Sequence, residues 1–267
     1  MNEGRPASLE TLASKVPKVA LAFWVIKLLA TTVGETGGDA LSMTLNLGYA
    51  TASLIYLAFF AATLAAQVSA RRYHPAIYWA VVVATTTVGT TVSDYLDRTV
   101  GLGYVKSSIA LLAAVIAILL VWRAARGRVQ FEGITDRRDE IFYWLTIVVA
   151  NTLGTALGDC TADDLGLGFS GGALVFAGLL AVVAALYRWA PRLPRSALFW
   201  AAYVLTRPFG ATLGDTLTKP RDEGGLALGR IGASLAIVLL MVAAIAVTSN
   251  RDRRRAPPPD RPRAPTP

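Results

Sequence analysis

A unit of fixed spacing recurs four times along this chain: a tryptophan, nine residues, a glycine, four residues and an aspartate. The copies are Trp24–Gly34–Asp39, Trp79–Gly89–Asp94, Trp144–Gly154–Asp159 and Trp200–Gly210–Asp215. Self-similarity at a fixed period is the signature of a repeat architecture, in which every copy builds the same supersecondary unit. Four acidic side chains therefore occupy equivalent positions in one fold.

The chain is too apolar for an ordinary soluble domain. Of its 267 residues, 54% are hydrophobic and 16% are charged, and the mean hydropathy is +0.49. Soluble domains are about 25% charged. Runs without any charge cover residues 45–66, 109–122, 175–186 and 235–248. Because a membrane span needs about 20 mostly apolar residues, the composition predicts a polytopic membrane protein.

Each repeat is predicted to hold two transmembrane helices. The first carries the tryptophan and ends at the aspartate, over residues 19–39, 76–94, 141–159 and 197–215. The second follows a glycine and covers 49–67, 104–123 and 169–187, while in repeat four a longer linker (216–228) leads to Gly229 and Arg230. The prediction is an all-α fold of eight transmembrane helices in four parallel two-helix repeats, pseudo-symmetric about the membrane normal.

The distribution of Lys and Arg predicts the topology. These residues gather before the first segment, after the second, fourth and sixth segments, and in the C-terminal tail. Loops rich in Lys and Arg are cytoplasmic, so both termini are expected in the cytoplasm, and no signal peptide is predicted. The expected parts are a cytoplasmic segment (1–16), a membrane domain (17–249, with repeats at about 17–70, 71–128, 136–190 and 195–249) and a disordered basic, proline-rich tail (250–267).

Small residues stand four positions apart near the end of each first helix. They are Gly34 and Gly38, Gly89 and Ser93, Gly154 and Gly158, and Gly210 and Gly214. Such pairs let helix backbones approach closely in a membrane, and we interpret them as packing positions. Trp24, Trp79, Trp144 and Trp200 lie near the cytoplasmic ends of these helices. That depth is typical of an aromatic belt, so we interpret them as interface anchors.

The repeat aspartates Asp39, Asp94, Asp159 and Asp215 permit two interpretations. Each lies about 18 residues into its helix, or roughly 27 Å at 1.5 Å per residue, which is the predicted outer interface. They are either ordinary loop-facing acids or a shared cation site with Glu35 as a fifth carboxylate, because oxygen ligands suit hard cations. An aspartate at a helix C-terminus opposes the macrodipole, which favours a compensating partner.

Lys27 and Arg207 interrupt the apolar pattern, each about ten residues into a first helix. Charges inside a membrane usually face the protein interior and indicate function. The alternatives are snorkelling or a structural ion pair, which for Lys27 would involve Glu35 or a repeat aspartate. Arg207 stands where the other repeats have Thr31, Thr86 and Asn151. We predict that Lys27 and Arg207 are internal charge partners of the transported ion.

Several classes of function lack their residues. One cysteine (Cys160) and one histidine (His74) exclude a disulfide framework and a site built from several cysteines or histidines. No Ser/His pair or paired intramembrane aspartates are visible, so no enzyme activity and no cofactor are predicted. The expected partners are the lipid bilayer and a small ion or solute, with no nucleic acid.

At Trp24, Trp79, Trp144 and Trp200 the chain resembles a family of bacterial inner-membrane proteins built from four tandem two-helix repeats of unknown function with a characteristic tryptophan. The resemblance covers about residues 17–249 and implies the architecture and an inner-membrane location. A weaker similarity is to cation/proton exchangers carrying Glu-x-Gly-Asp-(Lys/Arg)-(Ser/Thr). The segment from Glu35 to Asp39 has one residue more, and Gly214-Asp215-Thr216 keeps a fragment of that motif.

The leading hypothesis is a transport protein that moves a small cation, in its specific form a proton-coupled divalent metal, across the inner membrane. Two alternatives stay open: a structural or partner-binding membrane protein, and an anion path that uses Arg207. The predicted ion site comprises Glu35, Lys27, Arg207 and the four repeat aspartates, Asp39, Asp94, Asp159 and Asp215.

Overall fold

The computed structural model describes residues 14–70 and 72–255, with side chains up to residue 251. Within these ranges the chain forms eight α-helices and no strand, which confirms the predicted all-α fold. The helices are α2 (Leu21–Asp39), α3 (Gly48–Ser69), α4 (Pro75–Asp94), α5 (Tyr104–Arg126), α6 (Arg137–Asp159), α7 (Gly168–Trp189), α8 (Arg195–Thr218) and α9 (Arg230–Arg255). Each repeat contributes one consecutive pair.

The α-helices α2, α4 and α6 end at the repeat aspartates, but the helical backbone continues beyond them. Asp39, Asp94 and Asp159 are each followed by a five-residue π-helical turn, at Ala40–Thr44, Tyr95–Thr99 and Cys160–Asp164. Asp215 lies within α8, which runs on to Thr218. The predicted ends are therefore confirmed for α2, α4 and α6 and wrong for α8. Because a further helical turn follows each aspartate, the argument from the helix macrodipole does not apply to them.

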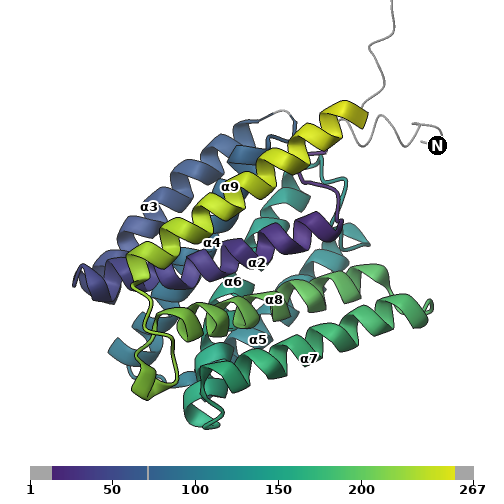
Figure 1. The fold of residues 1–267 in the computed structure, drawn as a ribbon. Helices are drawn as coiled ribbons and strands as arrows, with labels where there is room; N and C mark the ends of the chain where they lie inside the picture. The colour runs from purple at the N-terminus through teal and green to yellow at the C-terminus, as the bar shows by residue number, and fades with distance from the viewer. Residues whose placement is uncertain (1–13, 71, 256–267) are drawn as a thin grey trace, which may run out of the picture.

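The first helices of the four repeats form a closed ring. α2 packs on α4, α4 on α6, α6 on α8, and α8 returns to α2. Each second helix packs outside the ring, against the first helix of the following repeat: α3 on α4, α5 on α6, α7 on α8 and, closing the circle, α9 on α2. In Figure 1 the yellow α9 accordingly lies next to the purple α2.

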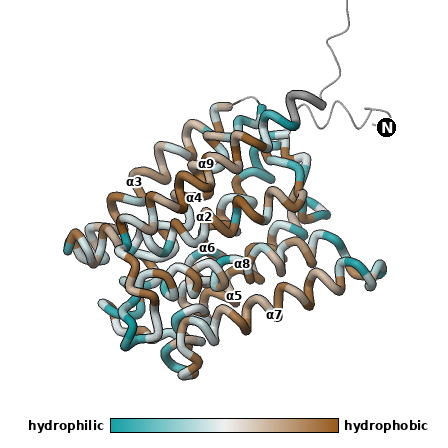
Figure 2. The backbone as a smooth tube through the Cα atoms, viewed as in Figure 1, coloured by the Kyte–Doolittle hydropathy of each residue, from teal (hydrophilic) through white to brown (hydrophobic). Residues whose placement is uncertain are grey.

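The outer helices are apolar and exposed. In the described part of the chain, six helices are long and apolar enough to cross a membrane, namely α3, α4, α5, α6, α7 and α9. The other two, α2 and α8, are more polar, since they contain Lys27, Glu35 and Arg207. Of the candidate span in α4, 72% is buried, against 11% of that in α9. Hydrophobic residues run along the helices and hydrophilic ones gather towards the ends of the bundle (Figure 2), as a membrane protein requires.

One end of the ring is closed by the segment that precedes α2. The backbone N–H of Lys15 donates to Ile134 O (3.1 Å), and its ammonium lies 2.9 Å from a carboxylate oxygen of Glu140. Val16 is buried in the core. At the other terminus, α9 continues to Arg255, past the predicted start of the tail at residue 250. The rest of the predicted terminal segments, 1–13 and 256–267, lies outside the described residues.

The repeat tryptophans belong to an aromatic core at this closed end. Trp79, Trp144 and Trp200 are each 3% exposed, and Trp24 is partly exposed. Tyr78 packs between Trp79 and Trp144, and Tyr143 between Trp144 and Trp200. A buried indole cannot lie among lipid headgroups, so the expected role as interface anchor is wrong for Trp79, Trp144 and Trp200. They stabilise contacts between ring helices instead.

Candidate ion site in the four-helix ring

Positions four residues apart form five buried layers in the ring. Counted from the aromatic end, the layers are Phe23, Tyr78, Tyr143 and Phe199; Lys27, Val82, Ile147 and Tyr203; Thr31, Thr86, Asn151 and Arg207; Glu35, Thr90, Thr155 and Ala211; and the four repeat aspartates. Side chains at i and i+4 share one helix face. All twenty residues are buried, so this face of each ring helix is turned into the protein.

The repeat glycines decide how closely the ring helices approach. A β-carbon at Gly34 would lie 2.4 Å from Thr86 Cβ, and one at Gly89 would lie 2.8 Å from the carbonyl carbon of Asn151. At Gly154 the clash would be with Arg207 and at Gly210 with Thr31. Each glycine therefore packs directly against the third-layer residue of the next helix around the ring. Only a missing side chain permits this contact.

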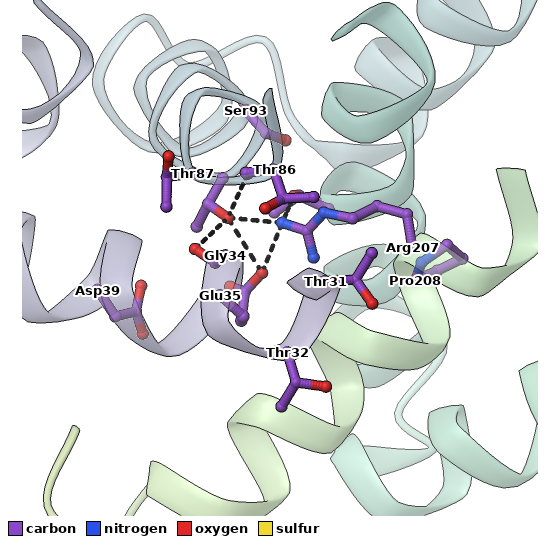
Figure 3. Close-up of polar contacts among 12 residues, drawn as sticks. Thr31, Thr32, Gly34, Glu35, Asp39, Thr86, Thr87, Ser93, Arg207 and Pro208 are labelled. Carbon is purple, nitrogen blue, oxygen red and sulfur yellow. Dashed lines mark hydrogen bonds and ion pairs between the residues drawn. The ribbon is translucent and has the colours of Figure 1, made fainter. Parts of the chain in front are cut away.

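Arg207 reaches the centre of the ring from α8. Its Nη2 donates to Glu35 Oε2 of α2 (2.9 Å), to Thr90 Oγ1 of α4 (2.5 Å) and to Thr155 Oγ1 of α6 (2.7 Å). One nitrogen thus contacts all three other ring helices, as the dashed lines of Figure 3 show in part. Arg207 is 0% and Glu35 3% exposed. The anionic partner of Arg207 is therefore Glu35, which the sequence had suggested only for Lys27. Thr90 and Thr155 are site residues that the sequence did not indicate.

Lys27 is also buried, but it has no anionic partner in the described part of the chain. Its Nζ lies 3.8 Å from the centre of the Tyr203 ring and makes no hydrogen bond with the described residues. The expected ion pair of Lys27 with Glu35 or a repeat aspartate is wrong, because Arg207 takes Glu35 and the aspartates lie three layers away. Arg207 Nε and Nη1 and the Tyr203 hydroxyl likewise have no hydrogen-bond partner among these residues.

We expect Lys27→Met to leave the free energy of unfolding unchanged or to raise it by about 1 kcal/mol, because methionine keeps the stem and removes a buried charge without a partner. The measurement is reversible unfolding in mixed detergent micelles. Val82→Met changes the same layer without removing a charge and serves as the control. A loss of several kcal/mol for Lys27→Met would show that the ammonium has a stabilising partner.

The four repeat aspartates point into the protein rather than into solvent, with exposures of 2–4%. They form two pairs, each bridged by a cation. Lys219 Nζ lies 3.5 Å from both Asp39 Oδ2 and Asp215 Oδ1, while Arg98 lies 3.3 Å from Asp94 and 3.6 Å from Asp159. The interpretation of the aspartates as ordinary loop-facing acids is therefore wrong, because they are buried and ion-paired.

Lys219 and Arg98 were missed as site residues, although the repeat carries a signal for them. Each stands four residues after the aspartate of its repeat, where repeats one and three have Met43 and Asp163. The even-numbered repeats therefore supply a cation that bridges their own aspartate to that of the next repeat. Arg230 adds a third cation, with Nε 3.4 Å from Asp39 Oδ2.

Glu35, Asp39 and Asp215 come close enough to share one metal ion. One carboxylate oxygen from each lies within 4.8 Å of the other two, and all three residues are buried. Carboxylate oxygens bind hard cations at about 2.0–2.6 Å, so such a spread fits a common coordination sphere. Asp94 and Asp159 are not part of this group. Of the seven predicted site residues, five are the buried acids, and Arg207 contacts one of them. Lys27 contacts none of the acids in the described structure.

Comparisons with known proteins identify the repeat but supply no activity. A search of curated proteins and a search of solved structures both find no match. A family model described as Repeat of Unknown Function (DUF347) matches residues 22–73, 77–128, 142–192 and 198–253. These four matches cover most of the chain and agree with the resemblance inferred from the tryptophans. The chain therefore belongs to the family defined by this repeat of unknown function.

Proposed function

We propose that this protein is an integral membrane transport protein that moves a small cation across the membrane through the ring of α2, α4, α6 and α8. The observation that carries this proposal is the set of five buried carboxylates at one end of the ring, three of which lie within 4.8 Å of one another. Buried acids at this density are costly unless they bind cations.

In this proposal all eight helices cross the bacterial inner membrane, and the repeats are related by a pseudo-fourfold axis along its normal. The cyclic contacts of the ring and its outer helices support this arrangement. Both termini would be cytoplasmic, since the end that carries Lys15, Arg126 and the basic loops would face the cytoplasm. The carboxylates then open towards the outer side.

The layers suggest how passage would be controlled. A cation that enters at the aspartates meets the Glu35–Arg207 pair in the next two layers, then Lys27, and finally the aromatic layer. Positive charges at the centre of a low-dielectric ring repel a cation strongly. Parallel repeats have no inverted symmetry that would exchange inward and outward states. We therefore place the moving parts at the Glu35–Arg207 pair and the aromatic layer.

An anion path through Arg207 is the second candidate. Three buried donors have no hydrogen-bond partner in the described chain: Lys27 Nζ, Arg207 Nε and Arg207 Nη1. Such donors can bind an anion by donating hydrogen bonds to it. A structural or partner-binding protein is the third reading, in which the buried ion pairs only fix the packing.

Flux into proteoliposomes distinguishes these readings. We expect wild-type protein to carry at least one of Mn²⁺, Mg²⁺, Ca²⁺, Na⁺ or H⁺, and Asp39→Asn/Asp215→Asn to lower that flux at least about tenfold. Asp164→Asn, at an exposed position of the π-helical turn that follows α6, is the matched control. Chloride flux that depends on Arg207 would favour the anion path. Absence of all flux from folded, reconstituted protein would leave the structural reading.

A further inference from the structure

The linker of repeat four carries a cation near each of its ends, and the one at its far end has no counterpart in the other repeats. It is longer than the others, it carries Lys219 near its start, and Arg230 at its end replaces the aromatic residue that follows the glycine elsewhere, namely Tyr49, Tyr104 and Phe169. Both cations contact the same atom, Asp39 Oδ2, at 3.5 and 3.4 Å. The two cations of this linker therefore converge on one carboxylate of the ring.

We propose that Glu35, Asp39 and Asp215 form a divalent-cation site. In this structure the side chains of Lys219 and Arg230 neutralise its carboxylates, and a divalent ion binds by displacing both. This inference deepens the proposed cation transport and rests on it for its physiological meaning. It names the class of ion and assigns the side chains of Lys219 and Arg230, at the two ends of the linker, as the groups that the ion must displace.

The present partners satisfy the carboxylates poorly. Asp39 Oδ2 and Asp215 Oδ1 are buried and accept no hydrogen bond from the described residues. Their ion-pair distances of 3.4–3.5 Å exceed the about 2.7–2.9 Å of a charge-assisted hydrogen bond. Buried polar atoms in this state call for a further ligand. Glu35, by contrast, is held at 2.9 Å by Arg207 through Oε2.

Charge balance selects a divalent ion. Glu35, Asp39 and Asp215 carry three negative charges, and Arg207, Lys219 and Arg230 carry three positive ones. A divalent ion that replaces Lys219 and Arg230 keeps this group neutral, while a monovalent ion would leave a buried negative charge. Oxygen-only ligands match Mn²⁺, Mg²⁺ and Ca²⁺ rather than softer metals.

The linker is built as a cover over Lys219. Leu226 N donates to Thr216 O (2.8 Å), Ala227 N to Lys219 O (2.9 Å) and Leu228 N to Leu217 O (2.9 Å), so the segment folds back on the end of α8. A β-carbon at Gly225 would lie 2.0 Å from Lys219 O, which shows how closely the backbone around Gly225 approaches the backbone at Lys219. Because the lysine stem is flexible, its ammonium can leave while this backbone stays in place.

Arg98 provides the contrast within the same ring. It stands at the position of Lys219 in repeat two and also bridges two aspartates, but no third carboxylate lies beside Asp94 and Asp159 within metal-binding distance in the described structure. We therefore assign exchange with the ion to Lys219 and a structural bridge to Arg98.

The test measures binding of Mn²⁺ to purified full-length protein in detergent, with electron paramagnetic resonance as the readout. Lys219→Met removes a tethered competitor and is expected to tighten Mn²⁺ binding at least about tenfold. Arg98→Met is the matched control and should leave the Mn²⁺ affinity unchanged, while Asp39→Asn should abolish binding. Equal affinities for wild type and a folded Lys219→Met protein, or equal gains for Lys219→Met and Arg98→Met, would overturn the inference.

A second measurement uses the wild-type chain. Acetylation of Lys219 by acetic anhydride, followed by mass spectrometry, should speed up when Mn²⁺ is added, and labelling of exposed Lys106 should not change. Unchanged Lys219 labelling at saturating Mn²⁺ would contradict displacement. Neither assay depends on transport. Mn²⁺ binding without flux would contradict only the proposed function, and flux without Mn²⁺ binding would contradict only this inference.

Discussion

Replacing Arg207 by methionine is expected to lower the free energy of unfolding by about 3–5 kcal/mol, because it leaves the buried Glu35 carboxylate charged and without its partner. The guanidinium also supplies hydrogen bonds to Thr90 and Thr155, which would be left without a donor. The measurement is unfolding of the purified protein in mixed micelles by a denaturing detergent, monitored by tryptophan fluorescence.

The double variant Glu35→Gln/Arg207→Met gives this prediction its control. Because both charges are removed together, most of the lost stability should return, since an uncharged pair costs far less to bury than a single ion. Lys27→Met removes another buried cation of the ring, one without an anionic partner, and should not show the loss. A double variant as unstable as Arg207→Met alone would mean that the ion pair is not the source of the stability.

The second large effect is expected at Gly210. A β-carbon there would lie 2.1 Å from Thr31 Oγ1, 2.6 Å from Thr31 Cβ and 3.1 Å from the Thr31 carbonyl carbon, so rotation of one side chain cannot relieve the clash. α2 and α8 must move apart. We expect Gly210→Ala to cost about 1–3 kcal/mol of unfolding free energy, the usual range for overpacking.

Gly178→Ala is the matched control for Gly210→Ala. Gly178 lies in α7, and a β-carbon there would meet no atom within 4 Å. Its substitution should be neutral or slightly stabilising, because alanine is the better helix former. If Gly210→Ala and Gly178→Ala unfold at the same detergent concentration, the close approach of α2 and α8 does not contribute to stability.

The sequence repeat predicted much of the fold. The common spacing from tryptophan to aspartate predicted four equivalent units of two helices, and the helices begin and end within a few residues of the predicted bounds. The predicted ends at the aspartates are correct for α2, α4 and α6, whereas α8 runs on to Thr218. What the sequence did not predict is that the backbone continues into π-helical turns at Ala40–Thr44, Tyr95–Thr99 and Cys160–Asp164. Such turns have no strong sequence signal of their own.

The environment of individual side chains could not be predicted in the same way. Lipid tails and a protein core are both apolar, so hydrophobicity does not tell which face of a membrane helix meets lipid and which meets another helix. For this reason Trp79, Trp144 and Trp200 were assigned to the membrane interface, although they lie in the aromatic core. The aspartates remained ambiguous between solvent and protein for a similar reason.

The sequence by itself determined the four repeats, the eight helices and the unusual residues Lys27, Glu35 and Arg207. The tertiary structure decided their partners, because ring closure brings α8 against α2 and places Arg207 beside Glu35, 172 residues earlier in the chain. It also placed Lys27 against Tyr203 and Lys219 between Asp39 and Asp215. Periodicity fixes which side chains share a helix face, but only the packing of helices fixes what that face meets.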